Sequence, residues 1–173
     1  GLDAGLARQR HFPSINWLNS YSLYPASLDQ WYRDNIAPDF PEKRTEISSL
    51  LQVESELQEI VQLVGSDALP VDQQLTLEVA RMIREYFLQQ NAFHDVDTFS
   101  SLEQQYKMTL AILSFQDEAK KAIAAGAALE DVVNVESRTN LMRARFEPGY
   151  LEKIDKLVDE MKKEINSAVE AEN

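Results

Sequence analysis

Apolar residues recur every three or four positions along most of the chain, a spacing that places them on one face of a helix. In residues 42–64 this repeat is interrupted only at Glu54, and its apolar positions are Ile47, Leu50, Leu51, Leu57, Ile60, Val61 and Val64. Residues 71–90 repeat the pattern with Leu75, Val79, Met82, Ile83 and Tyr86. The two segments therefore predict two amphipathic helices, the second ending at Asn91.

The residues between these segments predict a tight turn. Gly65 follows the last apolar position, where a left-handed glycine commonly ends a helix, and Pro70 stands near the first turn of the next helix. The connection between them is only a few residues long. We therefore expect a helix hairpin with its tip at residues 65–70.

Three further helical segments follow. After a loop at residues 92–99, the pattern Ser100-x-x-Glu103 resembles a capping box and predicts a helix to Ala125, which Gly126 would end. Residues 129–146 predict one short helix or two. After Pro148 and Gly149, a final helix from Tyr150 has a narrow apolar seam typical of a coiled coil, formed by Leu151, Ile154, Val158, Met161, Ile165 and Ala168.

The N-terminal part has a different character. Four of the six prolines, at positions 13, 25, 38 and 41, lie within it and its aromatic residues show no sustained period. We expect residues 1–24 to be a lead-in that is mostly loop, and residues 25–173 to be a helical domain that opens with a short helix from about Ser27 to Ile36. The fold class predicted is all-α, a helical bundle with a long helix hairpin and an irregular N-terminal lead-in.

Composition narrows the possible functions. The 173 residues, 44% of them hydrophobic, suffice for one globular core. With 17 basic and 29 acidic residues the net charge is −12, which repels phosphate backbones and anionic lipids and argues against nucleic acid and direct membrane contact. There is no cysteine and no apolar run of membrane-spanning length. Because the chain begins with Gly1, we expect a piece of a longer protein.

The sequence carries little catalytic chemistry. It lacks a phosphate-binding glycine loop, a Gly-x-Ser-x-Gly motif and a Glu-x-x-His pair. The pair His94-Asp95 would suit a metal phosphohydrolase only if His11 supplied a distant first ligand, so a polar loop is the preferred interpretation. Acidic runs such as Glu54-Ser55-Glu56 are interpreted as solvated faces. Phe12 and Phe93 stand apart because both are expected in loops, where a helix seam does not explain them.

Several long motifs resemble one family, in the same order along the chain. They are RQRHFPSINWLNSYSLY at 8–24, LLQVESELQEIV at 50–61, VGSDALP at 64–70, EVARMIRE at 78–85 and LQQNAFHDVDT at 88–98. This series closely resembles the segment that follows the nucleotide-binding domain in the catalytic A subunits of V-type and archaeal A-type rotary ATPases. The resemblance covers residues 6–173 and weakens after Gly126.

The resemblance implies a helical C-terminal domain that couples ATP hydrolysis or synthesis to rotation of a central stalk. It places the catalytic and Mg-binding groups upstream, so it implies no catalytic or metal residue in this chain, which should be inactive alone. ATP or ADP with Mg would be the parent complex's cofactor. Phe12 and Phe93 match aromatic positions of the adenine pocket, and Gln90 is a further candidate.

The resemblance also implies partners. The hairpin tip, Ser66, Asp67, Ala68, Leu69 and Pro70, would contact the rotor, although it lacks most of the acidic residues of the related F-type loop. The B subunits and further catalytic A subunits of the hexameric head, together with the central stalk subunits, would surround the domain, in a cytoplasmic head peripheral to the membrane. The alternative is a free-standing acidic helical scaffold, which would bind a partner through the seam at residues 151–168.

Overall fold

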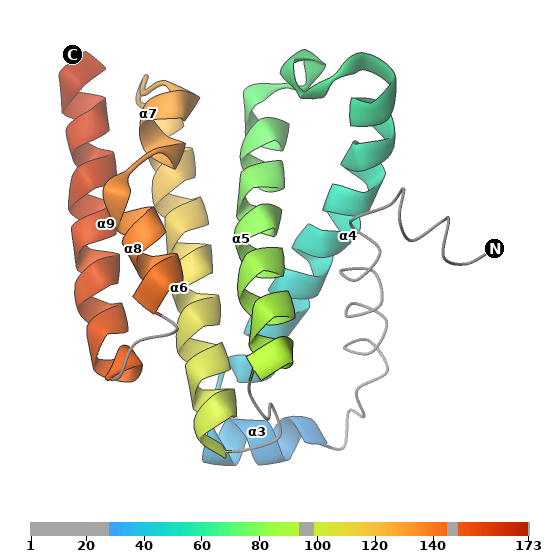
Figure 1. Cartoon of the computed structure of the whole chain (residues 1–173), viewed down its shortest axis with the longest axis vertical. Helices are drawn as coiled ribbons and strands as arrows, with labels where there is room; N and C mark the ends of the chain where they lie inside the picture. The colour runs from blue at the N-terminus through green and yellow to red at the C-terminus, as the bar shows by residue number, and fades with distance from the viewer. Residues whose placement is uncertain (1–27, 94–98, 145–148, 173) are drawn as a thin grey trace.

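The computed structural model describes residues 28–93, 99–144 and 149–172, and for residues 87–93, 99–101 and 172 it describes the helical backbone alone. The elements, in chain order, are α3 (Asp29–Asn35), α4 (Phe40–Val64), the 3₁₀ turn η2 (Ser66–Ala68), α5 (Val71–Phe93), α6 (Phe99–Ala124), α7 (Leu129–Val133), α8 (Glu136–Ala144) and α9 (Tyr150–Glu172). Helices α4 and α5 form a long hairpin, and α6 lies between this hairpin and α9 (Figure 1).

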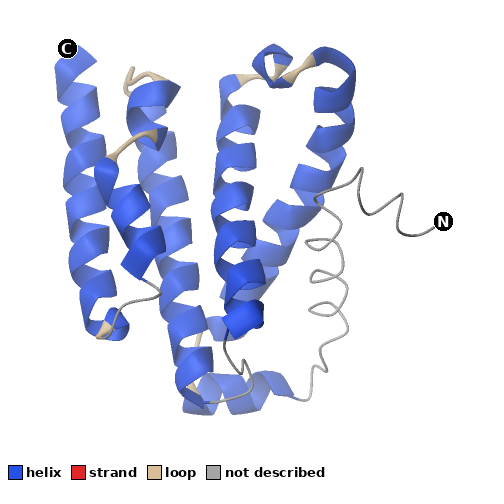
Figure 2. Cartoon of the chain, in the orientation of Figure 1, coloured by secondary structure: helices blue, strands red, loops and turns tan. Residues whose placement is uncertain are grey.

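The all-α prediction is confirmed for the part of the chain that the structure describes, which contains helices and turns and no strand (Figure 2). The hairpin is confirmed with its turn where Gly65 and Pro70 place it. Within the described ranges, no helix is both long enough and apolar enough to cross a membrane. The expected lead-in at residues 1–24, the expected helix start at Ser27 and the candidate Phe12 all lie outside the described residues.

Several boundaries differ from those expected. Helix α4 begins at Phe40 rather than residue 42, because Pro41 in the first turn has no amide hydrogen to leave unpaired. Helix α5 continues through Phe93, so the loop expected from residue 92 is wrong there, since neither glycine nor proline stops the helix. Ser100 is not the cap of α6, because the helix already includes Phe99. Residues 129–146 contain two helices, α7 and α8.

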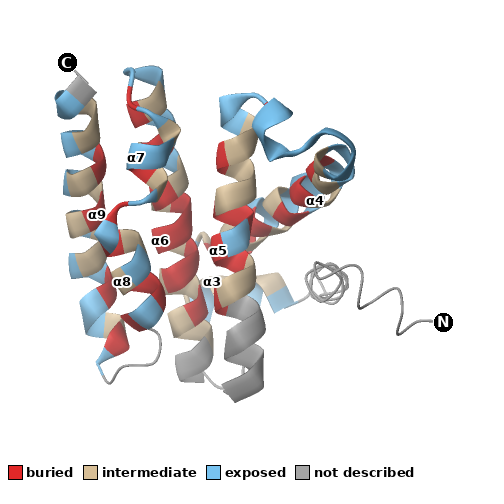
Figure 3. Ribbon diagram, turned by 45° about the horizontal axis from the view of Figure 1, so that its top comes forward, coloured by how far each residue is buried: buried red, intermediate tan, exposed pale blue. Residues whose placement is uncertain are grey.

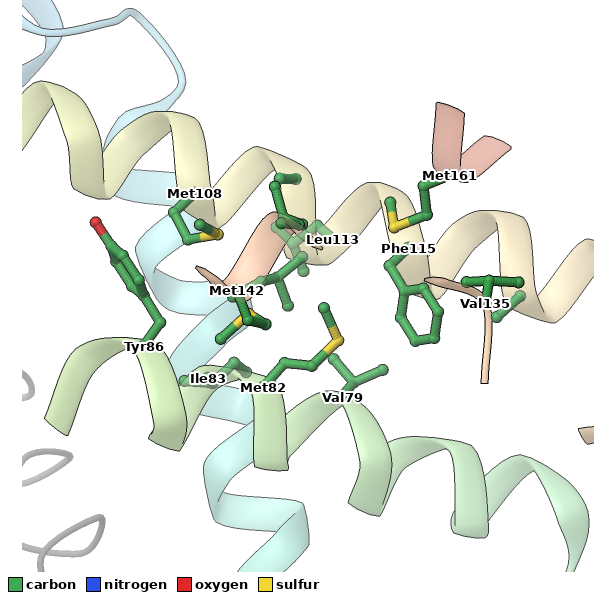
Figure 4. Close-up of a cluster of buried hydrophobic side chains, with 14 of the residues drawn as sticks. Val79, Met82, Ile83, Tyr86, Met108, Leu113, Phe115, Val135, Met142 and Met161 are labelled. Atoms are coloured by element: carbon green, nitrogen blue, oxygen red, sulfur yellow. The ribbon is translucent and has the colours of Figure 1, made fainter. Parts of the chain in front are cut away.

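The core lies where α5, α6, α8 and α9 meet. The predicted inner face of α5 is buried as expected, with Val79, Met82, Ile83 and Tyr86 directed toward Met108 and Phe115 of α6 (Figure 4). Burying a side chain of this size stabilises the fold by roughly 1.5–3 kcal/mol relative to leaving it in water. This face therefore holds the inner arm of the hairpin rigidly against α6.

The apolar seam of α9 packs inside the same molecule. Its central residues Ile154, Met161 and Ile165 are buried, and α9 packs on α6 and α8 (Figure 3). The coiled-coil spacing is thus satisfied by helices of this chain. The scaffold alternative, in which the seam binds a separate partner, is therefore wrong about that interface.

Candidate functional site

The tip of the α4–α5 hairpin is a short closed turn. Helix α4 ends as the Gly65 amide donates to the Val61 carbonyl at 2.8 Å, and Leu69 N donates to Ser66 O at 3.1 Å within η2. The Pro70 carbonyl accepts the first hydrogen bonds of α5, from the amides of Gln73 and Gln74, at 3.0 Å each. The turn is therefore closed by backbone hydrogen bonds at both of its ends.

Gly65 has the positive φ expected for it, but it is not left-handed helical. Its φ of 86° and ψ of 158° lie in a region that glycine alone occupies without strain. The extended ψ directs the chain outward from α4 before η2 begins. A side chain at this position would be strained even though an added Cβ would meet no atom within 4 Å.

A side chain also fixes the second half of the turn. Gln74 Nε2 donates to the Leu69 carbonyl at 2.9 Å, which ties the first turn of α5 back to the loop. Leu69 is buried, whereas Ser66, Asp67, Ala68 and Pro70 are exposed. The five predicted rotor-contact residues therefore divide into one internal anchor and four surface residues.

Apolar side chains beside the turn face solvent. Ile60 and Val64 were expected in the core, but they are 44% and 62% exposed, and Leu63 is 85% exposed. Val71, at the start of α5, is 44% exposed. Leu57 is the last fully buried residue of α4, and in the remaining part of the helix, about 10 Å long, only Gln58 and Val61 are partly buried.

We define Ile60, Leu63, Val64 and Val71 as the apolar tip. Its exposure was not predicted, although Ile60, Val61, Leu63 and Val64 together form an apolar group too wide for a single helix face. Exposed apolar groups gathered in one place mark interaction surfaces more often than scattered ones do. The acidic residues nearby, Asp67 and Asp72, are exposed and form no ion pair with any described residue.

A buried ion pair joins the two arms of the hairpin. Glu54 of α4 is only 2% exposed, and its Oε2 lies 2.8 Å from Nη2 of Arg84 on α5. The expectation that Glu54 belongs to a solvated face is wrong, because α5 covers that side of α4. Burial raises the pKa of Glu54 above its usual value, and the attraction of Arg84 opposes this shift only in part.

A second polar contact fixes the base of α4. The Tyr106 hydroxyl of α6 donates to Asp39 Oδ1 at 2.7 Å, and the rings of Phe40 and Tyr106 lie 5.5 Å apart. Burial, followed by the hydrogen bond to Asp39, raises the pKa of Tyr106 to about 12. Helix α4 is therefore held at two points, by Asp39 just before its start and by Glu54 further along.

The adenine-pocket candidates lie at the opposite end of α5 from the tip. Gln90 and Phe93 occupy the last turn of α5, about 29 Å and about 33 Å from its first residue at the helical rise. Their side chains are outside the described set, and Phe12 lies outside the described residues altogether. Thus the structure places the backbone of two candidates on one helix but does not test the pocket.

The described residues offer no cluster of metal ligands. Among them, no group of three or more His, Asp or Glu side chains is placed to hold a metal ion. The pair His94-Asp95 and the distant His11 all lie outside the described residues. The structure thus leaves the metal phosphohydrolase interpretation untested.

Comparison with known proteins gives a consistent result. A family described as the C-terminal domain of V and A type ATP synthase matches residues 29–133. The chain is 52% identical over 166 residues to the A subunit of the A-type ATP synthase of Methanosarcina barkeri, an alignment that covers 96% of this chain and 29% of that protein.

Two further relatives agree with the first. The A subunit of the A-type ATP synthase of Natronomonas pharaonis is 56% identical over 156 residues, which is 90% of this chain and 27% of the relative. The V-type ATP synthase alpha chain of Clostridium novyi is 51% identical over 174 residues, 99% of this chain and 29% of the relative. The chain thus spans under one third of the length of the curated relatives it matches.

Proposed function

This chain belongs to the family of C-terminal domains of V and A type ATP synthases, and from that membership we propose that it couples ATP hydrolysis or synthesis to rotation of a central stalk. In this proposal the α4–α5 hairpin is the moving part and its tip touches the rotor. ATP or ADP with Mg is bound by the parent protein, and this chain contributes no catalytic residue.

The proposal rests on two features of the hairpin: a buried ion pair that joins its two helices, and the exposed apolar tip. The buried contact of Glu54 with Arg84 and the packed face of α5 resist bending of the two arms. Leu63 and Val64, at the end of α4, are largely exposed. A stiff lever ending in apolar groups transmits force through shape, whereas an exposed carboxylate is screened by salt.

We further propose that the far end of α5 senses the nucleotide. Phe93 and Gln90 in the last turn of α5, together with Phe12, would line the adenine, because aromatic faces stack on bases. Since α5 is one continuous helix, a displacement at this end reaches the tip without an intervening hinge. The B subunits, other catalytic A subunits and the central stalk are the partners that this arrangement requires.

The test compares two tip variants in the assembled full-length complex. Replacing both Leu63 and Val64 by Ser removes exposed apolar groups without opening the core. Replacing both Asp67 and Asp72 by Asn removes charge alone. Single-molecule rotation should show reduced torque, or hydrolysis uncoupled from ion transport, for the Ser variant and nearly unchanged rotation for the Asn variant.

Two controls separate a contact effect from a folding effect. Nucleotide affinity and thermal unfolding should match the unmodified protein for both variants, because all four side chains are exposed. Substitution is preferable to deleting residues 66–70, since Leu69 is buried and anchors the turn. Normal torque in the Ser variant, or severe loss in the Asn variant, would overturn the assignment of the contact.

A further inference from the structure

The outer side of α8 is bordered by two grooves that share one residue. A groove of about 360 Å³ between α5 and α8 is lined by Arg81 and Arg138 among others, and one of about 390 Å³ between α8 and α9 is lined by Lys153 and Lys156. Arg143 lines both grooves. Helix α8 lies between α9 and α5 in Figure 1, so the two grooves flank this helix and share Arg143.

Arg143 differs from the other arginines that the structure describes. Those with a carboxylate partner are Arg33, Arg81, Arg84 and Arg138. Arg44 lies over the rings of Tyr32 and Phe40. Of the described arginines, Arg143 alone has neither kind of partner. The chain has 29 acidic residues and 17 basic ones, so its own carboxylates are plentiful, yet none of the described ones pairs with this exposed guanidinium.

The neighbouring side chains extend this pattern. Lys156, exposed across the second groove, has no ion-pair or hydrogen-bond partner among the described residues either. By contrast, Arg138 in the first groove already has partners within the chain. It donates to Glu78 Oε2 at 2.9 Å and to the Val133 carbonyl at 2.9 Å. The cations without a partner among the described residues are therefore Arg143 and Lys156, with uncharged Thr139 and Asn140 of α8 beside them. One glutamate lines each groove as well: Glu85 in the first, paired with Arg81 at 3.1 Å, and Glu160 in the second.

We propose that this surface, which we define as Asn134, Thr139, Asn140, Arg143 and Lys156, binds an acidic polypeptide segment of a partner protein. The free cations supply charge complementarity, which steers association and sets orientation. The amides and the hydroxyl supply hydrogen bonds to a peptide backbone. Such binding depends on the charge and shape of this surface and is independent of the rotary function proposed above.

The layout favours a polypeptide over other anions. The grooves lie on opposite sides of α8, so a small anion seated in one of them cannot also occupy the other, whereas an extended segment crosses both. A nucleic acid would bring a continuous row of phosphates toward a chain of net charge −12. A short acidic peptide places its negative charge only at this surface. At physiological ionic strength, interactions with charges more than roughly 8 Å away are largely screened, so the other acidic residues of the chain repel the peptide little.

The test uses this chain and a fluorescent oligo-glutamate peptide, with an oligo-glutamine peptide of equal length as the neutral probe. Fluorescence anisotropy should show binding of the glutamate peptide that weakens with salt. The double variant Arg143→Gln with Lys156→Gln should weaken it about tenfold, as expected for the loss of two exposed charge contacts. The matched control, Lys120→Gln with Lys162→Gln, makes the same charge change outside both grooves and should bind as the unmodified chain does.

Each other outcome overturns the proposal. Equal weakening in the matched control would indicate a general charge effect. Equal binding of the glutamine peptide would show that acidity is not recognised. Displacement of the peptide by inorganic phosphate at the same ionic strength would make this a small-anion site, and no binding of the glutamate peptide would remove the surface as a docking site. Thermal unfolding of both double variants should match the unmodified chain, because the substituted side chains are not part of the buried core.

Discussion

Glu54 and Arg84 form a buried contact. We predict that substituting Arg84 reduces the stability of the fold more than substituting Glu54 does. Arg84→Met keeps much of the volume of the arginine side chain but leaves the Glu54 carboxylate, 2% exposed, without its countercharge. Glu54→Gln keeps the shape of the glutamate and removes its charge. Arg84 is one quarter exposed, so its guanidinium still reaches water after that change.

The magnitudes follow from this difference in burial. An uncompensated buried carboxylate costs about 3 kcal/mol, so Arg84→Met should reduce the free energy of unfolding by that amount at pH 7. For a domain of this size the fall in melting temperature would be roughly 6–12 °C. Glu54→Gln should cost less than about 1 kcal/mol, because it also removes the desolvation that raises the pKa of Glu54.

The pH dependence gives an independent check. A carboxyl group with a raised folded-state pKa stabilises the fold below its ordinary value of 4.5, and this contribution is lost as the pH rises through the folded-state pKa. Without Arg84 that pKa rises further. The cost of Arg84→Met should therefore shrink as the pH falls from 7 toward 4. The cost of Glu54→Gln should grow over the same range, because the unmodified chain gains stability when Glu54 is protonated and the Gln variant does not.

The assay is urea unfolding of the two single variants and the double variant, measured at pH 7 and at pH 4. The double variant should be close to Glu54→Gln in stability, since no charge is then left buried. Equal costs for the two single variants at pH 7 would show that attraction rather than desolvation dominates the pair. A pH-independent cost for Arg84→Met would refute the reasoning as well.

Two other predictions concern the contact of Tyr106 with Asp39 and the proposed adenine pocket. Tyr106→Phe removes the hydrogen bond to Asp39 and should cost about 1 kcal/mol at pH 7. Because the Tyr106 pKa is raised to about 12, the unmodified chain should also lose stability between about pH 10 and 12 by a component that the variant lacks, and parallel pH profiles in urea unfolding would contradict this. In the full-length protein, Phe12→Ala or Phe93→Ala should weaken nucleotide binding about tenfold in calorimetry, equivalent to roughly 1.4 kcal/mol. Unchanged affinity with a lower melting temperature in the nucleotide-free state would instead make these residues packing anchors.

Much of the candidate site was accessible from sequence because its signals are local. Gly65 and Pro70 act on the backbone of their own turn, so the tip could be placed without knowledge of any other helix. The resemblance to a known family supplied the proposed role of that tip. Neither signal reports whether a neighbouring helix covers Leu63 or Val64, and so the apolar tip was missed.

The same division holds for the whole molecule. Helices form through hydrogen bonds between residues four apart, and apolar periodicity marks the face to be buried, so the sequence predicted the helices, their order and the inner face of α5. Which face meets which partner depends on residues distant in the chain. Glu54 became buried because α5 crosses it, and the α9 seam closed on α6 and α8 instead of a partner protein, since burial is a property of the assembled helices rather than of any one segment.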